Sequence, residues 1–562
     1  MKSTKIVEKD KTNGNFWLFG GLLCVLLASI MGRDINRPFI GLHSWGQAHE
    51  PWVTRVHLKY GLGYTKGLIT WAVGDPPTEN PARYLNHPQL SILIDAAFMG
   101  VLGIHDWSLR VVNAGMTILA LLLLLKILRG LLDEKTALLA GLFFVLYPLT
   151  GYFGVGSLLY PLVFLAFWCY LVLIKGLTDG PQPSARHKWG LALGLFFALQ
   201  MSWEGFFFAL AIGVHYVARC IWRRQFPNIA LLAILVIAPL SSLLLNFVIL
   251  AAGRGWDFKT LFDLYKWRAG PAELAQQMPK FDWGQWFAQL WEHAATNFSL
   301  PVLIIAIAYL TFGQLFVWTA VTAKRASATM KRRFPHFCLF LLPAVLQLFL
   351  LKGALWKHQT WERPLAMPVA MAAALGIMML GDQLAKIRPK LARQTYGGLA
   401  KIATAVLVAI ITISCAKGLN YYYSISHFSP ARVKLFKMLN QRIPPDNMLL
   451  SFQPFKVEQH KAKGSHYRPE IAWYLDREVI QATSLAEIQK QAQTGRFPYY
   501  LMPTTYYDKQ TSLHLARLSD ELRKLYKVQA YLPADPGGPR KAPMLPYLLF
   551  DLRSRASGYR DG

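Results

Sequence analysis

The 562-residue chain is short of charged residues: Asp, Glu, Lys and Arg make up 16% of it, and hydrophobic residues make up 54%. A typical soluble domain carries roughly 25% charged residues. The apolar residues gather in blocks of about 16 to 25, the length that crosses a hydrocarbon core of ~30 Å. This pattern excludes an ordinary soluble enzyme, a fibrous protein and a disordered scaffold. It predicts an α-helical protein that spans a membrane several times.

Acidic residues are also scarce, since 31 Asp and Glu face 60 Lys and Arg and leave a net charge of +29. In a soluble protein such an excess would indicate nucleic-acid binding. In a membrane protein it is first explained by topology and by attraction to anionic lipid. We therefore expect membrane lipids, and no nucleic acid, among the partners.

Cysteine is rare too, and the sequence contains no CxxC pair and no cysteine after Cys415. The five cysteines all fall within or at the end of apolar blocks, so nothing indicates a disulfide framework or a cysteine zinc site. We find no internal repeat and no low-complexity tract. The lack of an inverted repeat argues against a transporter that works by alternating access.

About eleven spans are predicted, with a retained signal anchor as the first and the N-terminus in the cytoplasm. Three basic clusters, at 219–224, 324–333 and 386–393, fall on the cytoplasmic side in this count. The protein is then expected in a bacterial inner or plasma membrane, with its C-terminus outside the cytoplasm. The predicted spans are 16–31, 89–104, 109–128, 137–148, 157–174, 189–217, 229–251, 298–320, 337–351, 364–380 and 399–416.

Three domains follow: a cytoplasmic N-terminus (1–15), a transmembrane domain (16–417) and an extracytoplasmic α/β domain (418–562). Segments 32–88 and 252–297 are long outer loops of the transmembrane domain. In the last domain, strand-like runs such as NMLLSF, YYLMPT and PYLLFDL alternate with helix-like runs such as SLAEIQKQAQ. That alternation is typical of βαβ units.

The first outer loop is rich in groups that can do chemistry, and a long loop in a compact fold is usually functional. It contains Asp34, His49 and Glu50, whose side chains suit a general base or a metal ligand. After Pro51, the run WVTRVHLKYG predicts a short amphipathic helix lying in the membrane interface. The alternative is that these aromatic and basic residues only anchor the loop at the headgroups.

Cations outside the cytoplasm run against the positive-inside bias, so we expect them to bind an anion such as a phosphate headgroup. His87 sits where the chain enters the second predicted span, in YLNHPQL, and a capping role is the alternative there. A short late loop, KGALWKHQTWERPLAMP, crowds several more basic side chains together. The candidate substrate-binding cations are His87, Arg268, Lys357, His358 and Arg363.

Two carboxylates fall inside predicted spans, where ionisable groups are functional candidates by default. Glu204, in QMSWEGFFFAL, is the stronger substrate-binding candidate, and Asp95, in LSILIDAAF, is the weaker. Either carboxylate could instead be neutralised by a neighbouring helix or lie near an interface.

The order of these motifs resembles the GT-C class of integral-membrane glycosyltransferases, specifically the protein O-mannosyltransferase-like group (glycosyltransferase family 39-like) with the lipid A aminoarabinose transferases. The resemblance covers residues 16–160 best: one span, a large outer loop, NHPQL, then GIHDWSLRVVNA and a leucine run. KHQTWERPLAMPVAMAAALG and the C-terminal α/β domain are similar as well.

The resemblance implies a polyprenyl-phosphate-linked sugar as donor, transfer outside the cytoplasm, and a loop carboxylate that deprotonates the acceptor, which is a lipid, a glycan or a protein. His87 matches the position where relatives contact the lipid phosphate. One departure stands out, because His49 occupies the place of the usual catalytic aspartate. The base is then Glu50 or Asp34, or else a divalent metal is held by His49 and Glu50, with His358 as a further ligand.

Three other functions stay open from the sequence. One is an oligosaccharide transferase or ligase that uses a pyrophosphate-linked glycan, and another is a carrier-lipid transporter or flippase. The third is an inactive relative that only binds carrier lipid, which the change of aspartate to His49 keeps open.

Overall fold

The computed structural model describes residues 14–85, 87–154, 158–179, 184–255, 259, 282–313, 328–353, 358–386, 395–458, 465–506, 508–532 and 546–555. The chain divides into two compact units. The first, which we call the helical unit, comprises Met1–Asp34, Val111–Val248 and Trp256–Asn420. The second, the mixed unit, comprises Ile35–Arg110, Ile249–Gly255 and Tyr421–Gly562.

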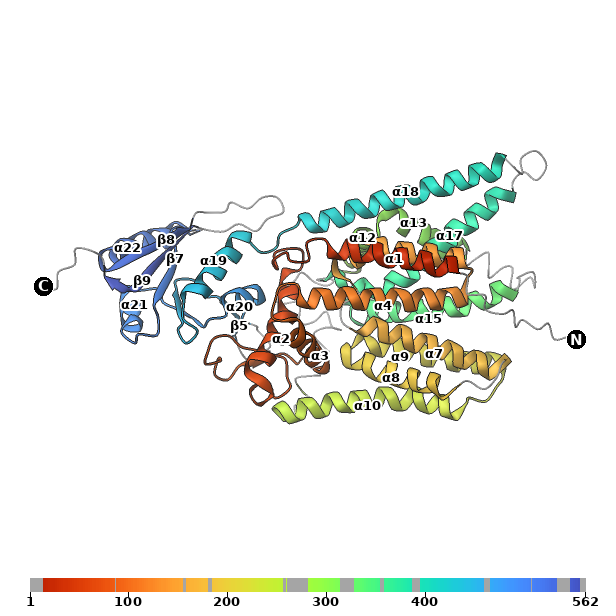
Figure 1. Cartoon of the computed structure of the whole chain (residues 1–562), viewed down its shortest axis with the longest axis horizontal. Helices are drawn as coiled ribbons and strands as arrows, with labels where there is room; N and C mark the ends of the chain where they lie inside the picture. Colours follow the sequence, from red (N-terminus) through yellow and green to blue (C-terminus); the bar gives the residue numbers. More distant parts are fainter. Residues whose placement is uncertain are drawn as a thin grey trace, which may run out of the picture. The chain divides into compact units, whose positions relative to one another are not determined.

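The helical unit is built from apolar helices (Figure 1). Three long helices, α4 (Ser108–Leu131), α10 (Ile229–Arg254) and α18 (Thr395–Ser424), also reach into segments of the mixed unit. The other elements are α1 (Gly14–Gly32), α5 (Glu134–Leu146), α6 (Pro148–Phe153), α7 (Leu159–Asp179), α8 (Ala185–Met201), α9 (Glu204–Arg223), α12 (Trp283–Phe298), α13 (Leu300–Ala308), η2 (Tyr309–Gly313), α15 (Ala328–Leu350), η3 (Gln359–Leu365) and α17 (Ala366–Lys386).

Within the described residues, seven helices are long and apolar enough to cross a membrane, or up to eight if a bent pair counts as one span. A multi-span helical membrane protein is therefore confirmed, whereas the predicted count of about eleven is not. The seven are Gly14–Gly32, Ser108–Leu131, Leu159–Leu177, Glu204–Arg223, Ile229–Arg254, Gln359–Gly381 and Ile402–Ser424, and the bent pair is Trp283–Phe298 with Leu300–Gly313.

Several predicted spans are shorter or broken in the structure. Those at 89–104 and 137–148 correspond to α3 (Leu90–Leu102) and α5, each of 13 residues. At 1.5 Å per residue, such helices fall short of a 30 Å core. The predicted span 298–320 starts at a 110° bend between α12 and α13, and its residues after 313 lie outside the described ranges.

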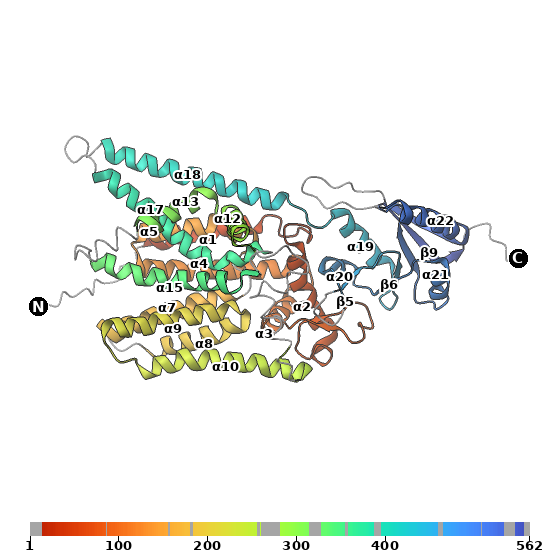
Figure 2. The ribbon, with the colours of Figure 1, turned by 180° about the vertical axis from the view of Figure 1, so that it is seen from behind.

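The predicted single span 189–217 was wrong, because the chain forms two helices there. Ser202 is extended (φ −160°, ψ 149°) and separates α8 from α9, which pack with α7 in Figure 2. A Cβ on Gly205 would lie 2.9 Å from the Ala198 carbonyl oxygen, so this close turn requires glycine. Hydropathy does not detect such a break, since both helices are apolar. As a result, Glu204 starts a helix and does not lie in the middle of one.

The mixed unit contains a five-stranded sheet with the order β6-β3-β7-β9-β8. Strands β3 (Leu449–Ser451), β6 (Val479–Gln481) and β7 (Tyr499–Pro503) are parallel, with Leu449 opposite Val479 and Tyr499. Strand β9 (Tyr547–Arg555) runs antiparallel to β7 and to β8 (Tyr526–Leu532). Strands and helices thus alternate in the C-terminal region as the sequence predicts, around a parallel βαβ core, and this region belongs to the same compact unit as Ile35–Arg110.

Alternate residues of these strands enter two separate cores. Leu450, Tyr500 and Phe550 pack with Ile488 of α21 (Leu485–Ala492) and with α22 (Lys509–Leu525) on one face. Figure 1 shows both helices beside the sheet. Leu449 and Leu501 point to the opposite face, which is covered by α19 (Pro430–Arg442), α20 (Pro469–Leu475) and α2 (Ser44–Thr65). Two small sheets, β1 (Thr70–Trp71) with β2 (Ala82–Arg83) and β4 (Lys456–Glu458) with β5 (Ser465–Tyr467), complete the unit.

Helix α2 contains the predicted amphipathic run, but the predicted location of its apolar side was wrong. The helix is 22 residues long and includes Pro51. Trp52, Val53 and Val56 are at most 2% exposed and belong to the core that contains Leu449 and Trp473. Burial in protein replaces the expected burial in lipid, because sequence periodicity cannot tell these two apolar environments apart.

Candidate active site

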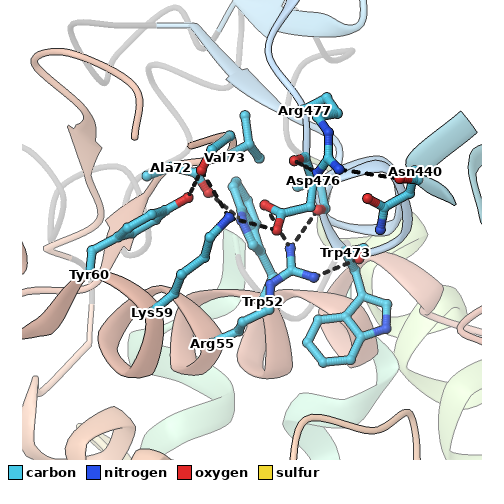
Figure 3. Close-up of polar contacts among 12 residues, drawn as sticks. Trp52, Arg55, Lys59, Tyr60, Ala72, Val73, Asn440, Trp473, Asp476 and Arg477 are labelled. Carbon is cyan, nitrogen blue, oxygen red and sulfur yellow. Dashed lines mark hydrogen bonds and ion pairs between the residues drawn. The ribbon is translucent and has the colours of Figure 1, made fainter. Parts of the chain in front are cut away.

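Helix α2 carries His49 and Glu50, and a buried ion pair fixes its middle against the end of α20 (Figure 3). The Arg55 guanidinium donates hydrogen bonds to the carbonyl oxygens of Trp473 and Ala472, both at 2.7 Å. It also lies 3.4 Å from Asp476, whose second carboxylate oxygen is 3.0 Å from the Lys59 ammonium. The side chains of Arg55 and Asp476 are only 10% and 13% exposed, so these charges depend on each other.

The backbone around this pair is held from both sides. Asp476 has a left-handed backbone (φ 46°), a conformation that aspartate tolerates better than most residues. The next side chain, Arg477, donates to the carbonyl oxygens of Ile443 at 2.9 Å and Asn440 at 3.2 Å, which ties α20 to α19. Burial, reinforced by the Asp476 carboxylate, raises the pKa of Tyr60, which keeps that phenol neutral. These contacts therefore fix the part of α2 that directly follows its N-terminal half.

His49 lies in an aromatic cluster, which we define as Trp45, His49, Trp52, Trp71, Tyr84 and His87. The His49 ring stacks on Trp45 with an interplanar angle of 6° and a centroid distance of 4.9 Å. Trp52, Trp71 and Tyr84 meet it edge-on, with centroids 5.3–6.3 Å away. His87 lies against Tyr84 at 5.6 Å. The cluster joins three elements of the first outer loop that are up to 42 positions apart.

The hydrogen bond of His49 defines its tautomer. The indole N–H of Trp71 donates to His49 Nε2 at 2.9 Å, so Nε2 is unprotonated and the ring proton lies on Nδ1. Nε2 is therefore already engaged and is a poor choice for a base or a metal ligand. Within the described ranges, no three His, Cys, Asp or Glu side chains come close enough to hold a metal ion. The hypothesis of a metal at His49, Glu50 and His358 gains no support from this.

Glu50 follows His49 but faces a different environment. Its side chain is exposed, whereas His49 is 7% exposed. Asp95 of α3 lies within electrostatic range of Glu50, although the sequence separates the two carboxylates by 45 positions. One accessible carboxylate beside a second, half-buried one is an arrangement that suits proton transfer. Asp34 is exposed as well, with a left-handed backbone (φ 56°), and it ends the first segment of the helical unit.

In the helical unit, two predicted residues come together around a tyrosine that the sequence analysis missed. Tyr160 of α7 lies within electrostatic range of both Glu204 and Arg363. The Tyr160 hydroxyl and the Arg363 Nε–H are buried and have no hydrogen-bond partner in the part of the chain that the structure describes. We call these three residues the Arg363 cluster. Two donors without an acceptor suit the oxygen atoms of an anion.

A buried polar network holds η3, the short helix that carries Arg363. Asn297 donates to the Glu362 carboxylate at 2.8 Å and to the Gln359 carbonyl oxygen at 3.0 Å. Gln347 donates to the Trp361 carbonyl oxygen at 2.9 Å. His358 precedes η3 and is exposed. Arg268 and Lys357, the other predicted cations, lie outside the described residues.

The sequence signals for the missed residues are weak. Tyr160 is an ordinary aromatic residue in an apolar span, and nothing in its neighbourhood marks it. Trp71 and Tyr84 are two of many aromatic residues in the first outer loop, although they contact the His49 ring. Tertiary contacts alone single out these three residues.

Comparison with known proteins agrees with this architecture. Residues 86–243 match the family model described as dolichyl-phosphate-mannose-protein mannosyltransferase. No curated protein matches the sequence. The crystal structure of ArnT from Cupriavidus metallidurans bound to undecaprenyl phosphate is similar, with 13% identity, a TM-score of 0.54, and coverage of 96% of this chain and 98% of that one.

The Archaeoglobus fulgidus oligosaccharyltransferase in complex with Zn and sulfate is also similar, with 11% identity and a TM-score of 0.52, over 94% of this chain and 72% of that one. Because identities this low show the fold alone, we conclude that the chain has the GT-C fold of integral-membrane glycosyltransferases. The resemblance predicted from the sequence is thereby confirmed at the level of the fold.

The buried ion pair predicts that removing the Asp476 carboxylate lowers the free energy of unfolding. Replacing Asp476 with Asn keeps the backbone preference but leaves Arg55 and Lys59 without their counter-charge, so the free energy of unfolding should fall by about 3 kcal/mol. The measurement is the apparent Tm of the purified protein in detergent. Lys437→Met, which removes a cation that is 50% exposed, is the control and should change Tm little. If the effects of Lys59→Met and Asp476→Asn simply add in the double variant, the coupling does not exist.

His57 predicts a specific pH dependence of stability. Burial lowers its pKa from 6.5 to about 4, and neither ring nitrogen has a hydrogen-bond partner among the described residues. The unfolded state thus binds more protons than the folded state between about pH 4 and 6.5, and stability falls as the pH drops through that window. His57→Phe should reduce the loss of Tm between pH 7.5 and 5. An unchanged loss in this variant would show that other groups cause it.

Proposed function

We propose that the protein transfers a sugar from a polyprenyl-phosphate carrier to an acceptor hydroxyl outside the cytoplasm, in a bacterial plasma membrane. The observation that carries the proposal is an accessible carboxylate, Glu50 of α2, with the Asp95 carboxylate of α3 within electrostatic range, in a chain with a GT-C fold. The match to a mannosyltransferase family model over residues 86–243 and the likeness to an ArnT structure bound to undecaprenyl phosphate support it.

In the proposed reaction, Glu50 accepts the proton of the acceptor hydroxyl as its oxygen attacks the anomeric carbon of the donor. A new C–O bond forms at that carbon, and the bond between it and the phosphate oxygen breaks. The electron pair leaves with the phosphate, which gives polyprenyl phosphate. Glu50 suits the base better than His49, because the acceptor nitrogen of His49 is already bonded to Trp71. Asp34, which is also exposed, is the rival base.

The Arg363 cluster is the proposed site for the carrier phosphate in the helical unit. Arg363 and Tyr160 each offer a buried donor without a partner, and charge-assisted donors are the strongest ligands for phosphate oxygens. The carbonyl and carboxylate contacts of Asn297 fix η3, so the guanidinium is held on a rigid element. His358, which is exposed and precedes η3, is proposed as a further phosphate ligand in the helical unit. The phosphate contact of His87, which belongs to the mixed unit, stays a prediction from the sequence.

The base assignment is tested by comparing Glu50→Gln with Asp34→Asn. In cells that lack the protein, each variant is expressed and the envelope glycans are analysed by mass spectrometry. Loss of a general base should reduce transfer by about 10²- to 10⁴-fold in Glu50→Gln, while Asp34→Asn stays within a few fold of wild type. The reverse ranking would make Asp34 the base. Full transfer by both variants would refute a loop carboxylate as the base.

The phosphate site is tested with undecaprenyl phosphate as the probe. Arg363→Gln should weaken its binding by about 10- to 100-fold, because a charge-assisted hydrogen bond is lost. Binding is measured by native mass spectrometry of the purified protein. Arg223→Gln, a change at an exposed arginine in the last turn of α9, is the matched control and should bind normally. Equal affinity of both variants would place the phosphate elsewhere.

A further inference from the structure

Trp45 is the exposed member of the aromatic cluster, whose other residues are buried or half-buried. Its side chain is 36% exposed, whereas Trp52 and Trp71 are 0% and 4% exposed. It lies in the first turn of α2, five positions before Glu50. The exposure of this indole, on the helix that also carries the candidate catalytic carboxylate, is not explained by core packing.

One face of the Trp45 indole packs against the His49 ring, whose own position is fixed by its contacts. His49, one helical turn further along, stacks on it almost in parallel, and Trp71 fixes His49 through the hydrogen bond to Nε2. Trp52 and Tyr84 close the edges of the His49 ring. An exposed tryptophan normally keeps several rotamers, but this backing favours one. A ligand that binds Trp45 therefore loses little free energy in ordering it.

The contacts of Trp45 leave binding capacity unused. Among the residues that the structure describes, His49 is the one ring that contacts it, and its indole N–H makes no hydrogen bond. The Trp45 indole offers two binding groups, a π face with partial negative charge and an N–H donor at the ring edge. The C–H face of a sugar ring carries partial positive charge, and its hydroxyl groups accept hydrogen bonds. A sugar ring fits both features at once.

We infer that Trp45 is a stacking platform for a sugar ring, which belongs either to the donor or to a glycan acceptor. The inference rests on the proposed glycosyl transfer. It also gives the histidine at position 49 a role, because a planar imidazole backs the indole and a carboxylate there would not. Relative to the family pattern, the acidic function then resides in the neighbouring Glu50, while His49 orders the sugar platform.

The first experiment measures sugar binding directly and does not require transfer. Saturation-transfer NMR with the detergent-solubilised protein uses methyl mannoside, methyl glucoside and methyl arabinoside as probes. At least one probe should show a signal that Trp45→Ala loses and that Trp45→Phe retains in part, because phenylalanine keeps a ring face but has no N–H. Trp222→Ala is the control, since Trp222 is 87% exposed at the end of α9.

The second experiment measures transfer kinetics with the donor and the acceptor varied separately. Trp45→Ala should raise one KM by about tenfold with a smaller change in kcat, as expected for a lost stacking contact. A raised donor KM, also seen in donor hydrolysis without acceptor, assigns the platform to the donor sugar. A raised acceptor KM alone assigns it to a glycan acceptor.

Three results would overturn the inference. One is a Trp45→Ala variant with wild-type KM values and wild-type probe signals. Another is an equal loss in Trp222→Ala, which would indicate that Trp45 only anchors the protein at lipid headgroups. The third is the lack of any Trp45-dependent probe signal in the wild-type protein. Failure of the proposed function is distinguishable, because the wild-type protein would then lack transfer while the Trp45-dependent probe signal persists.

Discussion

The mixed unit depends on charges that are removed from water and satisfied across more than 400 positions of sequence. Asp476 forms ion pairs with Arg55 and Lys59 of α2. The Arg55 guanidinium also donates hydrogen bonds to two carbonyl oxygens at the end of α20. Breaking such a buried set costs more than breaking exposed pairs, since the remaining charges stay uncompensated. This constraint makes α2 part of a protein core and fixes the helix that presents Glu50.

The arrangement of the candidate site depends on these contacts. They fix the middle of α2 and thereby define the direction of its N-terminal half. The Trp71 indole then sets the tautomer of His49, and the His49 ring in turn orients Trp45. Glu50 is left exposed on the same helix, with Asp95 as its neighbour. Structure and proposed chemistry thus share the same few side chains.

The sequence predicts well what depends on local pattern. Alternating strands and amphipathic helices of the C-terminal region appear in the predicted order, because hydrophobic periodicity and turn residues act within a few positions. The prediction of eleven spans was not confirmed, because the division of an apolar segment into separate helices depends on tertiary packing and not on local pattern. Hydropathy stays high across Ser202, so it cannot detect that α8 and α9 are separate helices.

Some of the candidate residues can be predicted from the sequence, and others are revealed only by the fold. Glu50 and Arg363 stand out by charge in an unexpected place, so the sequence can nominate them. The engaged nitrogen of His49 and the role of Tyr160 cannot be predicted, because Trp71 and Arg363 reach them through the fold. The apolar side of α2 illustrates the limit of periodicity, which detects a buried face without identifying its partner.

The composition of the mixed unit has a consequence for biosynthesis. Its first segment, Ile35–Arg110, is made before most of the helical unit, and the segment that completes its core, Tyr421–Gly562, is made after it. Arg55 therefore emerges from the ribosome more than 400 residues ahead of Asp476, and α2 lacks its counter-charge until Asp476 has been made. A chain that ends before Asp476 would therefore contain α2 without the carboxylate that compensates Arg55 and Lys59.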